Sequence, residues 1–257
     1  MNRPAPTSLE VLFTPAEFEA LAGRDLSQTT CVVFDVLRAT SSMVTALANS
    51  AEAIIPAAQI PEALAIRAQR PDALLAGERD GLRIGRELTG SVDFDLGNSP
   101  REFTAEKVRG KTIAMTTTNG TRALKGCAGA RTVLVGAFLN LAAIAAWTDR
   151  ARPARLLLVC SGTREDASFE DTLGAGALCD AVWEWYAGGH IADSAQMARM
   201  VYSGAKGDLL AAVGAHSRNG RRLLAIPELR DDVPFCLQRD SVELVAALGK
   251  DGSVRRV

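Results

Sequence analysis

The chain has 257 residues, of which 47% are hydrophobic and 23% charged, so it can bury a sizeable core and intrinsic disorder is excluded. Its 29 Lys and Arg residues nearly balance its 30 Asp and Glu residues, which gives a formal net charge of −1. No overall field attracts nucleic acid or an anionic membrane, so we expect neither as a partner, and an anionic ligand has to be recognised locally.

The five cysteines are widely spaced and form no CxxC pair, which is typical of reduced, mostly buried thiols rather than of disulfides or a zinc site. They are Cys31, Cys127, Cys160, Cys179 and Cys236. Residues 1–13 contain no apolar core of a signal peptide. The longest apolar stretch, residues 136–147, is interrupted by Asn140 and is too short to span a bilayer. We therefore expect a cytoplasmic protein.

Strand and helix patterns alternate along the first part of the chain. Strands are expected at residues 31–36, 53–56 and 73–76, with helices at about 40–51 and at 60–69. Asp35 lies at the end of the first strand, and Thr40 or Ser41 can cap the helix that follows. The resulting order βαβαβ is typical of a layered α/β fold.

A long loop over residues 81–103 interrupts this pattern, and loops of that length in compact domains are usually functional. Further strands are expected at residues 111–115, 132–135 and 155–160, and further helices at 120–127, 139–151 and 172–186. Beyond residue 188 the pattern is less regular, with helices at 194–202 and 206–212, and this part could form a capping subdomain. We expect a single domain over residues 1–257.

Acidic residues stand at the ends of several predicted strands. Asp35 follows a buried strand, where an unpaired carboxylate is costly, so it either pairs with Arg38 or acts as a metal ligand or nucleophile. Glu78 lies in the segment GERDG, which can also be a charged surface turn. Glu170 and Asp171 precede a helix, which Asp171 or the next residue can cap. Carboxylates from three separate strands or loops can bind Mg²⁺, which prefers oxygen ligands.

Two polar loops also follow predicted strands, TTTNGT at residues 116–121 and CSGT at residues 160–163. They supply hydroxyls, an amide side chain and backbone N–H groups, which can hold phosphate or sulfonate oxygens. Each can equally be an ordinary turn. At one edge of a sheet, two such loops favour an anionic ligand.

A third polar segment, FDLGNSPREF, occupies residues 94–103 of the long loop. Its Arg101 can bind an oxyanion in a bidentate manner, or it can simply be exposed to solvent. Other basic residues, namely Lys125, Arg221 and Arg222, read as surface or helix-end charges and are left out of the predicted site.

Several familiar phosphate chemistries are excluded by spacing. The chain has no GxxxxGK[ST] or GxGxxG segment, which argues against P-loop and dinucleotide enzymes. Leu37 stands where phosphatases with a strand-end aspartate nucleophile have a second aspartate, and Glu165 stands where cysteine phosphatases need an arginine five residues after Cys160. His190 and His216 lack a partner motif, so a Ser-His-Asp mechanism has weak support.

The chain resembles the 2-phosphosulfolactate phosphatase family from about Val32 to Cys236. The segments that carry the resemblance are FDVLRATS, GERDG, FDLGNSPREF, TTTNGT, CSGT and FEDTLGAGAL. The resemblance implies a Mg²⁺-dependent phosphoric monoester hydrolase that converts (2R)-2-phospho-3-sulfolactate to (2R)-3-sulfolactate and inorganic phosphate, a step in coenzyme M biosynthesis. It also implies a three-layer α/β/α fold, for which we expect a mixed, mostly parallel sheet.

The matched motifs suggest a set of site residues. The acidic positions assigned to Mg²⁺ are Asp35, Glu78, Glu170 and Asp171. The positions assigned to the anionic groups of the substrate are Arg38, Asn98, Ser99, Arg101, Thr117, Thr118, Asn119, Ser161 and Gly162. The catalytic residues are expected among Asp35, Arg38 and Cys160. The nucleophile is open between Asp35 itself, a water activated beside Asp35, and the Cys160 thiol, which suits a Mg²⁺ site poorly.

Two other functions stay open at this point. The substrate can be another small phosphorylated hydroxy acid, because substrates change within a fold. Alternatively, the protein binds a phosphate or sulfonate without catalysis, although three carboxylates beside an anion then serve no purpose without a cation. The sequence is also compatible with a homodimer.

Overall fold

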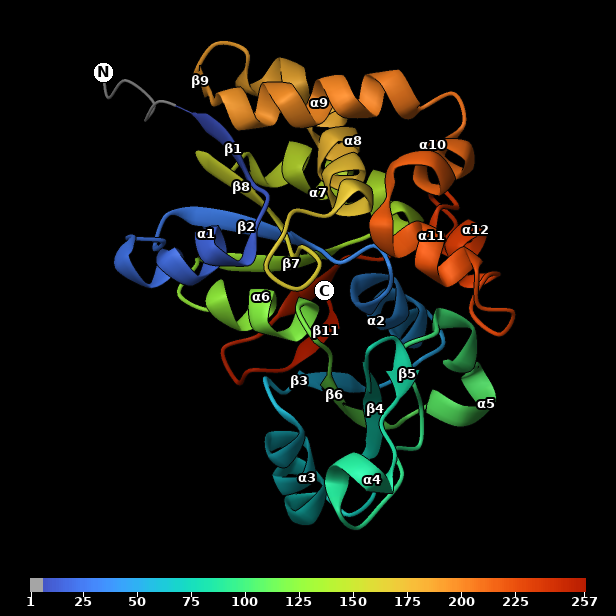
Figure 1. Cartoon of the computed structure of the whole chain (residues 1–257). Helices are drawn as coiled ribbons and strands as arrows, with labels where there is room; N and C mark the ends of the chain where they lie inside the picture. The colour runs from blue at the N-terminus through green and yellow to red at the C-terminus, as the bar shows by residue number, and fades with distance from the viewer. Residues whose placement is uncertain (1–6) are drawn as a thin grey trace.

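The computed structural model describes residues 7–257, so part of the amino-terminal segment, residues 1–6, lies outside the described chain. The described residues form one eleven-stranded sheet with helices on both faces (Figure 1). The strands are β1 Ser8–Leu12, β2 Thr29–Phe34, β3 Ala53–Pro56, β4 Leu74–Arg79, β5 Leu82–Arg83, β6 Thr112–Thr116, β7 Thr132–Gly136, β8 Arg155–Cys160, β9 His190–Ile191, β10 Ala246–Leu248 and β11 Val254–Arg256. Their order across the sheet is β5-β4-β6-β3-β11-β10-β7-β2-β8-β1-β9.

Two groups of parallel strands make up most of the sheet. One group is β4, β6 and β3, and the other is β7, β2, β8, β1 and β9. The carboxyl-terminal hairpin β10–β11 joins them by antiparallel pairing, with Ala247 opposite Leu134 of β7 and Val254 opposite Ile54 of β3. The predicted mixed, mostly parallel sheet is confirmed.

The hairpin also sets the relative direction of the two groups. Three antiparallel pairings separate β7 from β3, so the strands of one group run opposite to those of the other along the sheet. The two polar loops that follow β6 and β8 were expected at one edge of the sheet, and this is wrong because the two strands belong to different groups. The loops that meet at the site come from both groups.

The helices are α1 Pro15–Glu19, α2 Ala39–Ala48, α3 Ile60–Gln69, α4 Arg86–Thr89, α5 Ala105–Val108, α6 Gly120–Gly126, α7 Leu141–Ala151, α8 Phe169–Tyr186, α9 Asp193–Ala205, α10 Leu209–His216, α11 Arg218–Leu224 and α12 Asp232–Cys236. Short 3₁₀ turns cover Ala20–Gly23, Pro100–Glu102 and Phe138–Asn140. No helix within residues 7–257 is both long and apolar enough to cross a membrane.

Strand β2 shows why the fold has three layers. Side chains alternate between the two faces of a strand. Val33 therefore packs into the core under α2 and α6, whereas its neighbours Val32 and Phe34 pack into a second core under α7 and α8. Burial of apolar side chains on both faces stabilises the sheet as the central layer, as expected for an α/β/α fold.

Most of the predicted elements are present, and several coincide with the observed bounds, among them β3, α3 and β8. The predicted helix caps are wrong. Arg38 occupies the N-cap position of α2, while the Thr40 hydroxyl bonds the backbone of Asp35. Helix α8 begins earlier than predicted, because Ser168 caps it by accepting a hydrogen bond from the Asp171 amide. Because Ser168 caps the helix, the Asp171 carboxylate is free to make other contacts. All five cysteines are buried and unpaired, as predicted.

Candidate functional site

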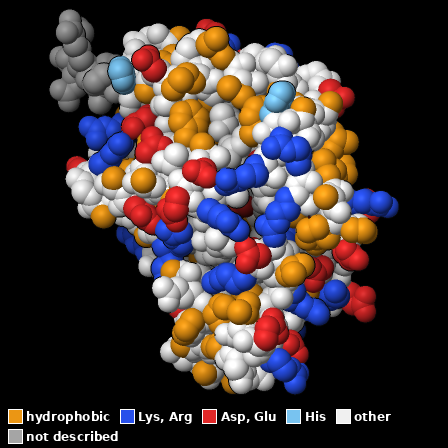
Figure 2. Space-filling view, in the orientation of Figure 1, with side chains coloured by type: hydrophobic (Ala, Val, Ile, Leu, Met, Phe, Trp, Pro, Cys, Tyr) orange, Lys and Arg blue, Asp and Glu red, His pale blue; other side chains and the backbone are white. Residues whose placement is uncertain are grey.

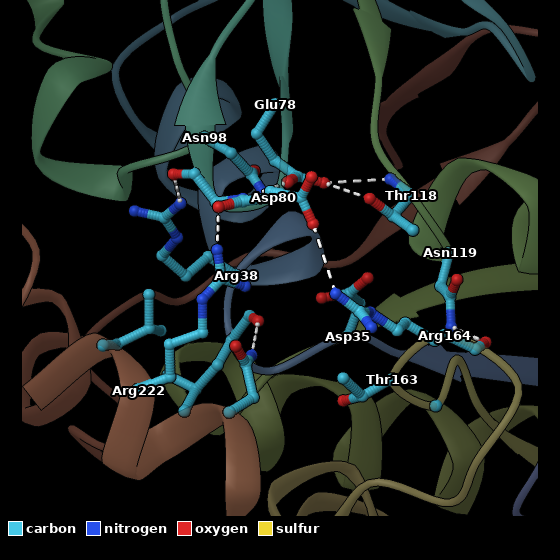
Figure 3. Close-up of a pocket in the computed structure, with 15 residues that line it drawn as sticks. Asp35, Arg38, Glu78, Asp80, Asn98, Thr118, Asn119, Thr163, Arg164 and Arg222 are labelled. Carbon is cyan, nitrogen blue, oxygen red and sulfur yellow. Dashed lines mark hydrogen bonds and ion pairs between the residues drawn. The ribbon is translucent and has the colours of Figure 1, made fainter.

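A pocket lies where the loops after β2, β4, β6 and β8 meet helix α11 (Figure 3). It is lined by Asp35, Leu37, Arg38, Glu78, Asp80, Gly81, Asn98, Thr118, Asn119, Gly162, Thr163, Arg164, Asn219, Arg222 and Leu223. Seven residues predicted from the sequence therefore line one pocket: Asp35, Arg38, Glu78, Asn98, Thr118, Asn119 and Gly162.

Asp35 lies directly after β2 at the base of the pocket. Its backbone N–H and C=O both bond the Thr40 hydroxyl, at 3.0 and 2.9 Å, which fixes the turn into α2. The carboxylate accepts a hydrogen bond from the Ala39 amide at 3.0 Å. Burial raises the pKa of Asp35 to about 6, helped by the nearby charges of Glu78 and Glu170 and opposed by the hydrogen bonds to Ala39 and Ser161. The protonation state of Asp35 therefore changes near neutral pH.

Glu78, at the end of β4, connects two loops. Its Oε1 accepts hydrogen bonds from the Thr118 amide and hydroxyl, both at 2.9 Å, and its Oε2 accepts one from the Gly81 amide at 2.7 Å. Charged acceptors make the stronger class of hydrogen bond. Glu78 therefore holds the β4 turn and the loop after β6 together at the pocket wall.

Arg38 is the one cationic side chain inside the pocket that is almost fully buried, with 3% of its side chain exposed. Its Nη1 donates to Oδ2 of Asp232 at 2.7 Å, and its Nη2 donates to the Gly81 carbonyl at 2.7 Å. Asp232 is itself fully buried at the start of α12. The α12 carboxylate therefore orients the guanidinium of a residue that lines the pocket.

Asp232 also binds two residues that the sequence assigned to the substrate. Its Oδ1 accepts hydrogen bonds from the Ser99 hydroxyl at 2.6 Å and from Nε of Arg101 at 2.8 Å. Arg101 further donates to the Glu228 carbonyl at 2.9 Å. Ser99 and Arg101 are absent from the pocket lining, and both surround the carboxylate that holds Arg38.

Asp171 joins the ends of β2 and β8 behind the pocket. Its Oδ1 accepts a hydrogen bond from the Val36 amide at 2.7 Å, and its Oδ2 accepts from the Ser161 hydroxyl at 3.1 Å and from the Gly162 amide at 3.2 Å. Burial raises its pKa well above the usual range, with further contributions from the charges of Asp35 and Glu170. Asp171 and Ser161 thus lie next to the pocket without lining it.

Three further predicted residues also lie outside the lining. Glu170 accepts hydrogen bonds from the Ser217 hydroxyl at 2.6 Å and from Nδ2 of Asn219 at 3.3 Å. Thr117 bonds the backbone amide of Thr121 at the start of α6, at 3.3 Å. Cys160 is fully buried, and burial raises the pKa of its thiol well above the usual range.

Two amide oxygens of the pocket lack a protein donor. Asn119 donates through Nδ2 to the carbonyls of Ser161 at 3.0 Å and Arg164 at 2.8 Å. Its Oδ1, like Oδ1 of Asn98, is buried without a hydrogen-bond partner among the described residues. A buried unsatisfied acceptor costs about 1 to 3 kcal/mol. Both residues line the pocket, so a ligand or a cation there can relieve this cost.

Comparison with known proteins shows the family of this chain. The model of the 2-phosphosulpholactate phosphatase family matches residues 16–251. The chain belongs to the 2-phosphosulfolactate phosphatase family. It is 37% identical over 248 residues to a protein of Caldanaerobacter subterraneus subsp. tengcongensis named "Probable 2-phosphosulfolactate phosphatase", with 95% of this chain and 97% of the relative covered.

Other relatives carry the same name. The Clostridium acetobutylicum protein is 36% identical over 217 residues, covering 84% of this chain and 88% of its own. The Thermotoga maritima protein is 35% identical over 219 residues, covering 85% and 88%. The name describes phosphoric monoester hydrolases, and the predicted family and enzyme class are confirmed.

Several residues outside the predicted set also line the pocket. Thr163 ends the CSGT loop that was expected to hold an anion, and Arg164 follows it directly. Asp80 lies in the GERDG segment, and Asn219 was not predicted. The expectation that Arg222 is only a surface charge is wrong, because it also lines the pocket. No local pattern distinguishes it from Arg221.

Arg221 and Lys125 do lie on the surface as expected. Arg221 donates to the Ala215 carbonyl at 2.7 Å, and Lys125 pairs with Glu62. Asp232 is a further residue that sequence reasoning missed. Its partners are distant in the chain, so only the fold reveals it.

Proposed function

We propose that the protein is a Mg²⁺-dependent phosphatase that hydrolyses (2R)-2-phospho-3-sulfolactate to (2R)-3-sulfolactate and inorganic phosphate. The observation that carries the proposal is one pocket lined by the acidic residues Asp35 and Glu78 and by the buried Arg38. Acidic residues beside a fixed cation are the equipment of metal-assisted phosphoryl transfer. Family membership supports phosphate esters as the substrate class.

The residues of the pocket fit Mg²⁺. Asp35 and Glu78 offer carboxylate oxygens, and the unpartnered Oδ1 atoms of Asn98 and Asn119 are of the same hard type. Burial and the charges of nearby carboxylates raise the pKa of Asp35 and of Asp171, and a bound cation would oppose this effect. Mg²⁺, when bound, neutralises charge on the transferring phosphoryl group.

The donor set also argues for Mg²⁺ over a metal that needs a full protein cage. Residues 7–257 contain no group of three or more His, Cys, Asp or Glu side chains placed to hold a metal ion. Mg²⁺ usually binds through one or two carboxylates and fills its remaining positions with water and substrate phosphate. Asp35 and Glu78 would hold the ion from the protein side.

Arg38 has a distinct role in this proposal. Two of its five N–H groups are used by Asp232 and the Gly81 carbonyl, and the side chain still lines the pocket. The remaining N–H groups are available for equatorial oxygens of the phosphoryl group, whose charge develops in the transition state. Because Asp232 and the Gly81 carbonyl already fix the guanidinium, it needs little reorganisation during the reaction.

Asp35 either activates the nucleophile or is itself the nucleophile. In one route it accepts a proton from a water whose oxygen attacks phosphorus, and in the other its own carboxylate attacks and water later hydrolyses the aspartyl phosphate. In both routes the P–O ester bond breaks, and the leaving alkoxide takes a proton, from Asp35 in the first route and from solvent water in the second. Cys160 is left out, because it is a buried thiol outside the pocket.

A substrate panel tests the proposal. Phosphate release is measured with 2-phosphosulfolactate, with other 2-phosphorylated hydroxy acids and with simple phosphomonoesters, each in the presence of Mg²⁺. We expect the highest kcat/KM for 2-phosphosulfolactate. Higher turnover of another hydroxy acid would reassign the substrate within the same reaction class. Ligand-induced thermal stabilisation without turnover of any ester would show a binding protein instead.

A further inference from the structure

Two arginines at the mouth of the pocket are not used by the chemistry proposed above. Arg164 follows β8, and Arg222 lies on α11. Both are exposed, and Figure 3 shows them on opposite sides of the turn that carries Asp80. Figure 2 shows basic side chains gathered over the middle of this face of the molecule. The chain is nearly neutral overall, so this arrangement is local.

Asp80 connects the two arginines. Its Oδ1 lies 3.5 Å from Nη2 of Arg164, and its backbone carbonyl accepts a hydrogen bond from Nη2 of Arg222. The Asp80 carboxylate is therefore the anion that Arg164 faces in the free protein.

The contact between Arg164 and Asp80 is easily exchanged. The two side chains are 75% and 78% exposed, and exposed ion pairs contribute little to stability. The buried pair of Arg38 and Asp232, at 2.7 Å, is of the opposite kind. A ligand anion can thus replace Asp80 beside Arg164 at small cost.

The backbone holds both side chains at the mouth. Arg164 has φ 58° and Asp80 has φ 52°, both in the left-handed region that such residues rarely adopt. Asn119 fixes the Arg164 carbonyl at 2.8 Å, and Glu78 fixes the amide of Gly81 at 2.7 Å. Residues of the pocket wall thus fix the backbone at Arg164 and next to Asp80, while the charged ends of the two side chains lie in solvent. Such partial order lowers the entropy cost of binding.

The interior of the pocket cannot accept a second anionic group. Asp35 and Glu78 outnumber Arg38 there, and a Mg²⁺ ion held by them would serve the phosphoryl group. A further acid group on the substrate therefore needs positive charge elsewhere, and the mouth supplies it. Arginine is well suited to planar and tetrahedral oxyanions because its N–H groups can bind two oxygens at once.

We propose that Arg164 and Arg222 form a second anion subsite, which binds the acid groups of the substrate that are not transferred, a sulfonate and a carboxylate. In the free protein the Asp80 carboxylate pairs with Arg164, and the acid groups of the substrate displace it. The proposal rests on the proposed function, because it assigns the non-reacting end of the same substrate. It makes Arg164 and Arg222 specificity residues, distinct from the groups that act on phosphorus.

Direct binding separates this subsite from catalysis. Calorimetry measures the Kd of 3-sulfolactate, which has both acid groups and no phosphate, and the Kd of inorganic phosphate, each with Mg²⁺. In Arg164→Gln and Arg222→Gln we expect the Kd of sulfolactate to rise roughly tenfold or more, and that of phosphate to change by less than about twofold. Arg221→Gln, an exposed neighbour that donates to the Ala215 carbonyl, is the matched control and keeps both values.

Asp80→Asn provides a change in the other direction. Asparagine tolerates the left-handed backbone of Asp80 and removes the competing charge, so sulfolactate should bind more tightly while phosphate binding changes little. The subsite is overturned if both glutamine variants bind sulfolactate like the wild type, if they lose phosphate equally, or if the wild type does not bind sulfolactate. Phosphate release from phosphosulfolactate is assayed separately, so failure of the proposed reaction is distinguishable from failure of the subsite.

Discussion

Arg38 and Asp232 are 194 positions apart in the chain, yet Nη1 of Arg38 lies 2.7 Å from Oδ2 of Asp232 in a buried ion pair. Arg38 precedes α2 and lines the pocket, whereas Asp232 begins α12. Helix α12 thus contributes to the site because its Asp232 fixes the position of the Arg38 guanidinium. Removal of one partner from a buried pair costs about 3 to 5 kcal/mol, because the other charge is left uncompensated.

Asp232→Asn is expected to impair both stability and turnover. The neutral amide cannot balance Arg38, so Tm should fall by roughly 10 °C and kcat/KM by roughly tenfold or more. Scanning calorimetry and a phosphate-release assay measure the two effects. The control is Asp231→Asn, because Asp231 is 63% exposed and lies 3.7 Å from Arg101. Wild-type values of both quantities in Asp232→Asn would refute the positioning role of this carboxylate.

Asp35→Asn is expected to stabilise the metal-free protein at neutral pH. The pKa of Asp35 is about 6 in the folded protein, against an ordinary value of 3.8, so the unfolded chain loses this proton first as pH rises. The contribution of Asp35 to the free energy of unfolding is most favourable below pH 4. It falls by about 3 kcal/mol as the pH rises from 4 to above 6. Asparagine cannot ionise and avoids this loss.

The measurement is the free energy of unfolding in chelator between pH 4 and pH 8. Asp35→Asn should be more stable than the wild type above pH 6, and the difference should shrink toward pH 4. The exposed Asp72→Asn, outside the pocket, should behave like the wild type. An Asp35→Asn protein that is less stable at pH 7 than at pH 4, relative to wild type, would disprove the assigned direction of the shift.

Mg²⁺ should stabilise the wild type but not Asp35→Asn. A ligand at about one hundred times its Kd stabilises the folded state by about 2.7 kcal/mol, which corresponds to several degrees in Tm for a chain of this size. Thermal unfolding with increasing Mg²⁺ measures the effect. An equal rise in Tm for the two proteins would place the cation somewhere other than beside Asp35.

Cys160→Ala tests the remaining nucleophile. The thiol is fully buried and its pKa is raised well above the usual range, so little thiolate exists at neutral pH. We expect kcat to stay within about twofold of wild type, with a Tm a few degrees lower because of the small cavity. Loss of turnover with an unchanged Tm would instead assign the attack to sulfur.

The local parts of this fold could be read from the sequence. The bounds of β3, α3 and β8 follow from apolar runs and helix signals within about ten residues, and these elements were predicted as observed. The hairpin β10–β11 was missed. Its strands have three residues each, and their partners Leu134 and Ile54 lie far away in the chain. The relative direction of the two strand groups depends on that hairpin.

The site could be predicted to the same extent. Polar residues directly after strands, such as Asp35 and Asn119, reach the pocket because the strand delivers them there. Arg101, in the long loop, was also assigned to the substrate, but it lies against Asp232 instead. Asp232 and Arg222 come from helices whose placement follows from tertiary packing, so no neighbouring residue in the sequence reveals their role.

Phosphate release from 2-phosphosulfolactate, with Mg²⁺ present and after its removal, tests the central claim most directly. We expect wild-type release that saturates with Mg²⁺, stops in excess chelator and returns when Mg²⁺ is restored, and a rate in Asp35→Asn that is lower by roughly a hundredfold or more. Full release in excess chelator, or wild-type turnover by folded Asp35→Asn, would contradict a metal-assisted phosphatase centred on Asp35.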